Sequence, residues 1–177
     1  MKKFKGILII FLIFVVICFL QMNFFTWFNI AGIMPNLYVV LVLFIGLFVG
    51  EKLGIVFGIW FGIILDLLFG RIVGISSVLL AIVGFIGESF DKNFSKDNRI
   101  MIILISIGST IIFEVGNYIF KYALLKTNIE IPDFIINLLI ENLFNTLIIL
   151  IFYSGMKRLG YYLEEYFKGR KLLTRYF

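Results

Sequence analysis

The chain has 177 residues, of which 62% are hydrophobic and 15% are charged, and its mean hydropathy is +1.08. A soluble domain averages roughly 45–50% apolar residues, so this sequence has too little polar surface for a water-soluble fold. Cys18 is its one cysteine and histidine is absent, which excludes an intramolecular disulfide, a cysteine metal site and a histidine-dependent catalytic triad. We therefore expect a membrane protein without enzymatic activity, metal or cofactor.

Charged and turn residues divide the sequence into six apolar segments, each long enough or nearly so to cross a hydrocarbon core of ~30 Å. The apolar runs are continuous, whereas the strands of a membrane barrel alternate with a period of two. The second and third segments are short, and are predicted either to cross with little tilt or to form together a compact hairpin that turns at Glu51 and Lys52. The predicted fold is an all-α, polytopic membrane helix bundle with six transmembrane helices, at roughly residues 7–28, 36–50, 53–70, 72–90, 100–122 and 133–156.

Basic residues gather on one side of such a bundle. Thirteen of the 16 lysines and arginines lie at the N-terminus, in two of the connections and in the C-terminal tail, and the remaining three are Arg71, Lys121 and Lys126. Basic connections face the cytoplasm, so both termini are predicted to be cytoplasmic (N-in/C-in). The net charge of +5 then indicates contact with anionic lipid rather than with nucleic acid.

The C-terminal residues 157–177 are predicted to be distinct from the transmembrane domain, residues 1–156. In this tail, apolar and aromatic residues recur at spacings of three and four between Leu159 and Phe167, with charged residues between them. The pattern favours a basic amphipathic helix that lies on the anionic cytoplasmic leaflet. A frayed, solvated tail is the alternative.

A ladder of small residues crosses the second, third and fourth segments at intervals of four. Its members are Gly46, Gly50, Gly54, Gly58, Gly62, Asp66, Gly70 and Gly74. Four residues rotate a helix by about 400°, so the row forms an inclined groove along a direction of helix packing. Small residues let helix backbones approach closely, on which association in lipid depends. The groove is predicted to receive either the protein's own helices or a partner's transmembrane helix.

Polar side chains gather in the outer half of the predicted bundle. Five polar residues between Ser106 and Lys121 share one face of the fifth segment, because they follow steps of three and four. Intramembrane carboxylates are costly and mark either function or a tight internal network. The predicted intramembrane polar nest consists of Asp66, Glu114, Asn117, Lys121, Glu141, Asn142 and Asn145. A structural hydrogen-bond network, a ligand pocket, a site for a partner helix and an ion path are its possible roles.

The run GIWFGIILDLLFGRIVG, residues 58–74, holds most of the ladder and includes Asp66. Together with Pro35 and Asn36, which open the second segment, it resembles the family of the rod shape-determining protein MreD. The length, the six spans and the basic tail match that family as well. Its architecture is similar to that of the substrate-binding subunits of energy-coupling-factor transporters.

The resemblance implies a component of the cell-elongation machinery in the bacterial cytoplasmic (inner) membrane. The expected direct partner is MreC, a single-span protein, and through the complex the chain would meet MreB, RodA and a penicillin-binding transpeptidase. The implied function is a non-enzymatic scaffold that helps organise peptidoglycan synthesis and rod cell shape. The alternative is a small-molecule-binding, vitamin-type transporter subunit, because such subunits bind ligands where the polar nest is expected.

Overall fold

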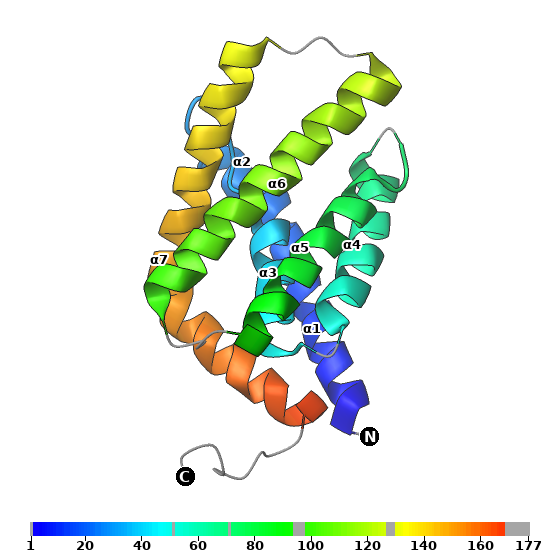
Figure 1. The fold of residues 1–177 in the computed structure, drawn as a ribbon, viewed down its shortest axis with the longest axis vertical. Helices are drawn as coiled ribbons and strands as arrows, with labels where there is room; N and C mark the ends of the chain where they lie inside the picture. The colour runs from blue at the N-terminus through cyan, green and yellow to red at the C-terminus, as the bar shows by residue number, and fades with distance from the viewer. Residues whose placement is uncertain (1, 51, 71, 94–97, 127–129, 169–177) are drawn as a thin grey trace.

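The computed structural model describes residues 2–50, 52–70, 72–93, 98–126 and 130–168, and this part of the chain is helical without a β-strand (Figure 1). The six apolar segments all form helices, which confirms the all-α class. The first segment is interrupted by a π-helical turn. The bounds are α1 Lys2–Phe19, η1 Leu20–Phe24, α2 Phe25–Trp27, α3 Leu37–Phe48, α4 Leu53–Phe69, α5 Ile75–Asn93, α6 Arg99–Leu125 and α7 Ile131–Lys168.

Three of these helical stretches are long and apolar enough to cross a membrane, namely Lys3–Trp27, Arg99–Leu124 and Ile131–Phe167. The other three helices are shorter, and α3 has only 12 residues. At 1.5 Å per residue α3 rises about 18 Å, which is well short of a ~30 Å hydrocarbon core. A helix of this length inside the hydrocarbon core would need protein around its ends.

α3 meets this need because the other helices enclose it. It contacts α1, α4, α5, α6 and α7, and every residue of α3 except Tyr38 is buried. Figure 1 shows it in the middle of the bundle, behind α5 and α6. Irregular backbone at membrane depth is tolerated where protein buries it and supplies its hydrogen bonds. Polar side chains beside the start of α3 can thus have a structural task.

The helices α3, α4 and α5 pack backbone against backbone through glycines. A Cβ atom added at Gly46 would lie 2.5 Å from the carbonyl oxygen of Gly84, and one at Gly58 would lie 2.5 Å from that of Leu80. At Gly54 and Gly62 the nearest obstacles are also backbone atoms of α3 and α5. Backbone cannot yield as a flexible side chain can, so these positions require glycine. At these four glycines, the groove receives the protein's own helices.

α7 continues without a break to Lys168, so the sixth segment and the first part of the predicted tail form one helix. The last turns of α7 bend beneath the bundle (Figure 1). Leu163 and Phe167 are buried there, and Phe167 lies against Gly6 of α1. At these two residues the apolar face packs on the protein's own helices, where the sequence predicted contact with the leaflet. Residues 169–177 lie outside the described part of the chain.

The start of α1 and the end of α7 lie at the same end of the bundle, which we call the terminal end (Figure 1). At the opposite end, called the far end, lie the last turns of α6 and the first turns of α7. The half of the bundle nearer to it, called the far half, contains the start of α3, the end of α4 and the start of α5 (Figure 1). The far ends of α6 and α7 project beyond the shorter helices (Figure 1). At the terminal end, Gly50 and Lys52 flank the α3–α4 turn with positive φ angles of 59° and 65°, and Glu51 lies outside the described residues.

Candidate functional site

Asn36 starts α3 inside the far half of the bundle. Its side-chain oxygen accepts a hydrogen bond from the N–H of Val39 at 3.3 Å, which is an N-cap. Its own backbone N–H donates to Oδ1 of Asn145 on α7 at 2.8 Å. The first turn of a buried helix leaves N–H groups without intrahelical partners, and these two bonds satisfy two such groups without water.

Gln21, in the π-helical turn after α1, holds the same segment from the other side. Its Nε2 donates to the carbonyl oxygen of Pro35 at 2.6 Å, and its Oε1 accepts from the N–H of Leu37 at 3.3 Å. One amide thus pairs two backbone groups of the loop that enters α3. Gln21 was not among the predicted polar residues, and the available signal was an amide side chain, followed by Asn23, that interrupts a long apolar run.

A polar network ties α3, α6 and α7 together. Nδ2 of Asn36 donates to Oε1 of Glu114 at 3.4 Å, and Nδ2 of Asn145 donates to Oγ1 of Thr110 at 3.1 Å. The carboxyl group of Glu141 lies near enough to Glu114 and Asn36 to interact with both. Asn145 and Thr110 are 1% and 0% exposed, so lost bonds here could not be replaced by water. The network fixes where the two long helices meet the buried start of α3.

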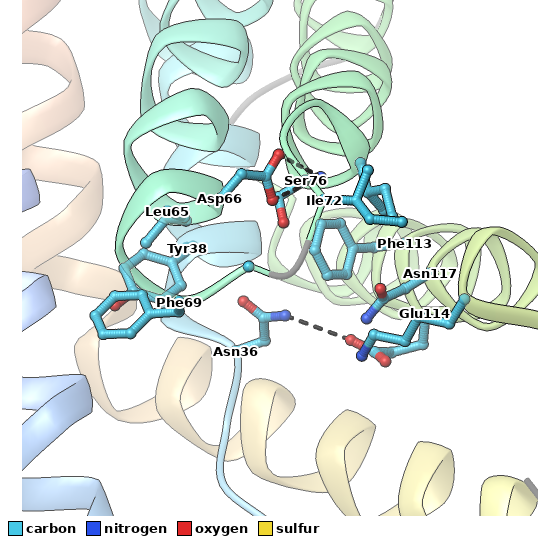
Figure 2. A pocket seen from close by; sticks show the side chains of 13 residues that line it. Asn36, Tyr38, Leu65, Asp66, Phe69, Ile72, Ser76, Phe113, Glu114 and Asn117 are labelled. Carbon is cyan, nitrogen blue, oxygen red and sulfur yellow. Dashed lines mark hydrogen bonds between the residues drawn. The ribbon is translucent and has the colours of Figure 1, made fainter. Parts of the chain in front are cut away.

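Asp66 caps a different helix. Its Oδ2 accepts from the N–H groups of Gly74 at 2.7 Å, Ser76 at 3.1 Å and Ser77 at 3.4 Å, and Figure 2 shows the contact with Ser76. Asp66 is 3% exposed. A carboxylate at a helix N-terminus satisfies orphan N–H groups and faces the positive end of the helix dipole. Asp66 therefore locks the start of α5 to the end of α4.

A cavity of about 540 Å³ separates the Asp66 cap from the Asn36 network (Figure 2). The labelled side chains in Figure 2 come from α3, α4, the α4–α5 connection, α5 and α6 and surround one space. Sites for small molecules have this order of size and combine apolar walls with a few placed polar groups. The lining residues are Asn36, Tyr38, Leu65, Asp66, Phe69, Gly70, Ile72, Ile75, Ser76, Phe113, Glu114, Asn117 and Lys121.

The glycine ladder has several tasks rather than one. Four of its members lie in the α3–α4–α5 packing described above. Gly50 and Gly74 have positive φ angles of 59° and 114° and belong to turns. Gly70 follows α4, where an added Cβ would lie 2.7 Å from the carbonyl oxygen of Asp66. The regular spacing thus combines helix packing with two turns and a helix end.

The predicted polar nest is also divided. Four of its members line the cavity, whereas Glu141 and Asn145 reach Asn36 from α7 behind it. Asn142 donates to the carbonyl oxygen of Leu138 at 3.0 Å, within its own helix, and its side-chain oxygen has no hydrogen-bond partner among the described residues. Among the residues that the structure describes, no three histidine, cysteine, aspartate or glutamate side chains lie together as a metal ion would need.

Long apolar helices, a fully enclosed short helix and polar caps buried beside a cavity define an α-helical membrane protein. The chain belongs to the family of the rod shape-determining protein MreD, whose family model matches residues 2–159. No curated protein and no solved structure matches it. The match includes Pro35, Asn36 and Asp66, the residues on which the resemblance rested.

Proposed function

We propose that the protein is a non-enzymatic scaffold of the bacterial elongation complex, which binds MreC and helps organise peptidoglycan synthesis and rod cell shape. The family match over residues 2–159 carries this proposal. The roles of the motif residues support it, because Asn36 and Asp66 engage their polar atoms in holding helices together. Helices held in fixed positions suit a protein that presents a rigid surface to its partners.

The proposed setting is the cytoplasmic membrane, with all six helices embedded and the terminal end in the cytoplasm. The common position of the start of α1 and the end of α7 supports an even number of crossings (Figure 1). α3 is too short to cross alone, and we propose that it crosses inside the protein with its start capped by Asn36, Gln21 and Asn145. MreB, RodA and the transpeptidase would be reached through the complex.

The partner's transmembrane helix has to bind a lipid-facing surface. α5 already occupies the glycines of α3 and α4, so the ladder has no room there for a second helix. Large exposed apolar side chains instead lie on the outside of several helices. One representative of each of four faces is Leu12 of α1, Trp60 of α4, Leu104 of α6 and Ile151 of α7, exposed by 62%, 63%, 59% and 72%.

Site-directed photocrosslinking tests the proposal. A photoreactive amino acid is placed at each of these four positions in cells that contain MreC, and Val83, which is 0% exposed, serves as the internal control position. We expect a crosslink to MreC from one or two neighbouring faces and none from Val83. Stable insertion of all four variants without any crosslink to MreC would overturn direct binding.

The cavity of about 540 Å³ favours the second candidate, a small-molecule-binding transporter subunit. That function requires an ATP-hydrolysing partner module, which a scaffold does not need. Gentle purification followed by mass spectrometry separates the two proposals. Recovery of such a module in place of MreC would support the transporter subunit.

A further inference from the structure

The cavity of the far half presents opposite charges on one wall. Glu114 and Lys121 both line it from α6, and they interact electrostatically. They stand seven residues apart, which is two helical turns or about 10 Å along the axis. Asn117, between them, also lines the cavity and interacts with Glu114. The wall thus has a negative end beside Asn36 and a positive end nearer the tip of α6.

The third charged group of the cavity is already neutralised by its surroundings. Asp66 faces the N-terminus of α5 and receives three backbone N–H groups, so the helix end balances much of its charge. A ligand would therefore meet mainly the two poles on α6. The remaining walls include Leu65, Phe69, Ile75 and Phe113 and offer apolar contact.

These poles select the charge of a ligand. An anion would be attracted to Lys121 and repelled by Glu114, and a cation would be attracted to Glu114 and repelled by Lys121. Either one would leave the cavity with an unbalanced charge. A molecule with both charges lies antiparallel to the wall, so that its cationic group meets Glu114 and its anionic group meets Lys121. It adds no net charge to the cavity.

We propose that this cavity binds a zwitterionic head group, an ammonium and an anionic group a few bonds apart, with an apolar portion that contacts the phenylalanine and aliphatic walls. The proposal is independent of the scaffold function. The same chemistry is offered by a phosphatidylethanolamine lipid and by a soluble zwitterion such as free phosphoethanolamine.

Binding can be measured with the purified full-length protein in detergent. The probes are short-chain phosphatidylethanolamine, short-chain phosphatidylglycerol with the same acyl chains, and free phosphoethanolamine, and the readout is saturable binding by calorimetry and native mass spectrometry. Saturable binding of the ethanolamine lipid, with at least about 10-fold weaker binding of the glycerol lipid, supports the proposal and a lipid source. Comparable binding of free phosphoethanolamine supports it with a soluble source.

Two pairs of variants connect the binding to the cavity. Lys121→Gln removes the positive pole and should weaken binding about 10-fold or more, as expected for the loss of a charge-assisted hydrogen bond. Lys126→Gln, at the C-cap that follows α6, should not. Ile75→Trp fills the cavity and should abolish binding, whereas Val78→Trp on the 50% exposed side of α5 should leave it intact.

Three results would overturn the proposal. They are equal affinity for the ethanolamine and glycerol lipids, absence of saturable binding of all three probes to the wild-type protein, and unchanged binding in both Lys121→Gln and Ile75→Trp. Detergent-induced unfolding of all four variants is measured beside binding, so that loss of binding counts only in a variant that unfolds like the wild-type protein.

Discussion

The closely packed centre of the bundle and its far half are held together by different means. In the centre, α3, α4 and α5 approach so closely that added Cβ atoms at four glycines would collide with backbone. In the far half, α6 and α7 are joined to α3 by amide, hydroxyl and carboxyl groups, beside a cavity of about 540 Å³. Van der Waals contact provides cohesion where lipid supplies no hydrophobic drive, and polar groups satisfy the backbone at the buried start of α3.

The largest effect is expected from a bulky residue in the packed centre. Gly58→Leu places four carbons where a single Cβ would already lie 2.5 Å from the carbonyl oxygen of Leu80. Overpacking against backbone should lower the free energy of unfolding by about 3 kcal/mol, at the upper end of the usual range for added carbons. Unfolding by titration with denaturing detergent measures it. Gly155→Leu is the control, since nothing lies within 4 Å of that glycine's added Cβ; equal losses would refute the packing argument.

The second effect concerns the polar half. Asn145→Leu removes the acceptor of the Asn36 N–H and the donor to Thr110, both in buried surroundings, and should cost about 1–3 kcal/mol of unfolding free energy. Asn142→Leu is the matched variant one turn away, and it removes a side-chain oxygen that has no described partner. We expect it to be neutral or slightly stabilising in the same titration. The reverse order would contradict the assigned network.

A third change tests the cap of α5. Asp66→Leu removes the acceptor of three N–H groups and should destabilise the protein by about 1–2 kcal/mol, as the loss of a helix cap does. Insertion should be preserved, whereas recovery of MreC in a pull-down should fall. Asp66→Asn keeps one oxygen acceptor and should restore part of both. Normal cell shape with Asp66→Leu at native abundance would remove Asp66 from the residues that matter for function.

The smallest effect is expected at the π-helical turn. Gln21→Leu removes two hydrogen bonds to the loop before α3, in a partly buried place, and should cost about 1 kcal/mol. Asn23→Leu, in the same turn, loses a bond to the carbonyl oxygen of Phe19 within its own helix and should change the unfolding free energy by less than about 0.5 kcal/mol. Hydrogen exchange of the Leu37 amide offers a local readout. Unchanged exchange in Gln21→Leu would show that Gln21 does not hold the loop before α3.

Much of the fold could be predicted because it depends on hydropathy. Six apolar segments and their order follow from where charges and turns interrupt the sequence, and all six are helices. The extent of α7 could not be predicted, because its continuation to Lys168 depends on contacts with Gly6 and Phe48 of distant helices. Hydropathy identifies an apolar face and cannot decide whether lipid or protein covers it.

Spacing could group polar residues on one helix face, but it could not predict Gln21 or the connections between helices. Spacing placed Thr110 and Glu114 on one face of α6, and the structure gives both hydrogen-bond partners from other helices. Spacing could not reveal that Asp66 accepts hydrogen bonds at the start of α5 while Glu114 accepts one from Asn36 at the start of α3. Those partners depend on which helix ends lie beside each carboxylate. Asn142 shows the opposite case, since it neighbours Glu141 in sequence yet faces its own helix.

The close packing of the centre is tested most directly by replacing glycine with alanine at one packed and one open position. The measurement is whether each substitution lowers or raises the free energy of unfolding. Gly62→Ala puts a Cβ against the backbone of Ser77, whereas nothing lies within 4 Å of an added Cβ at Gly108 in α6. We predict that Gly62→Ala lowers the free energy of unfolding by about 1–3 kcal/mol, and that Gly108→Ala raises it by about 0.5–1 kcal/mol through helix propensity. Equal changes, or stabilisation by Gly62→Ala, would contradict the close packing of α4 on α5.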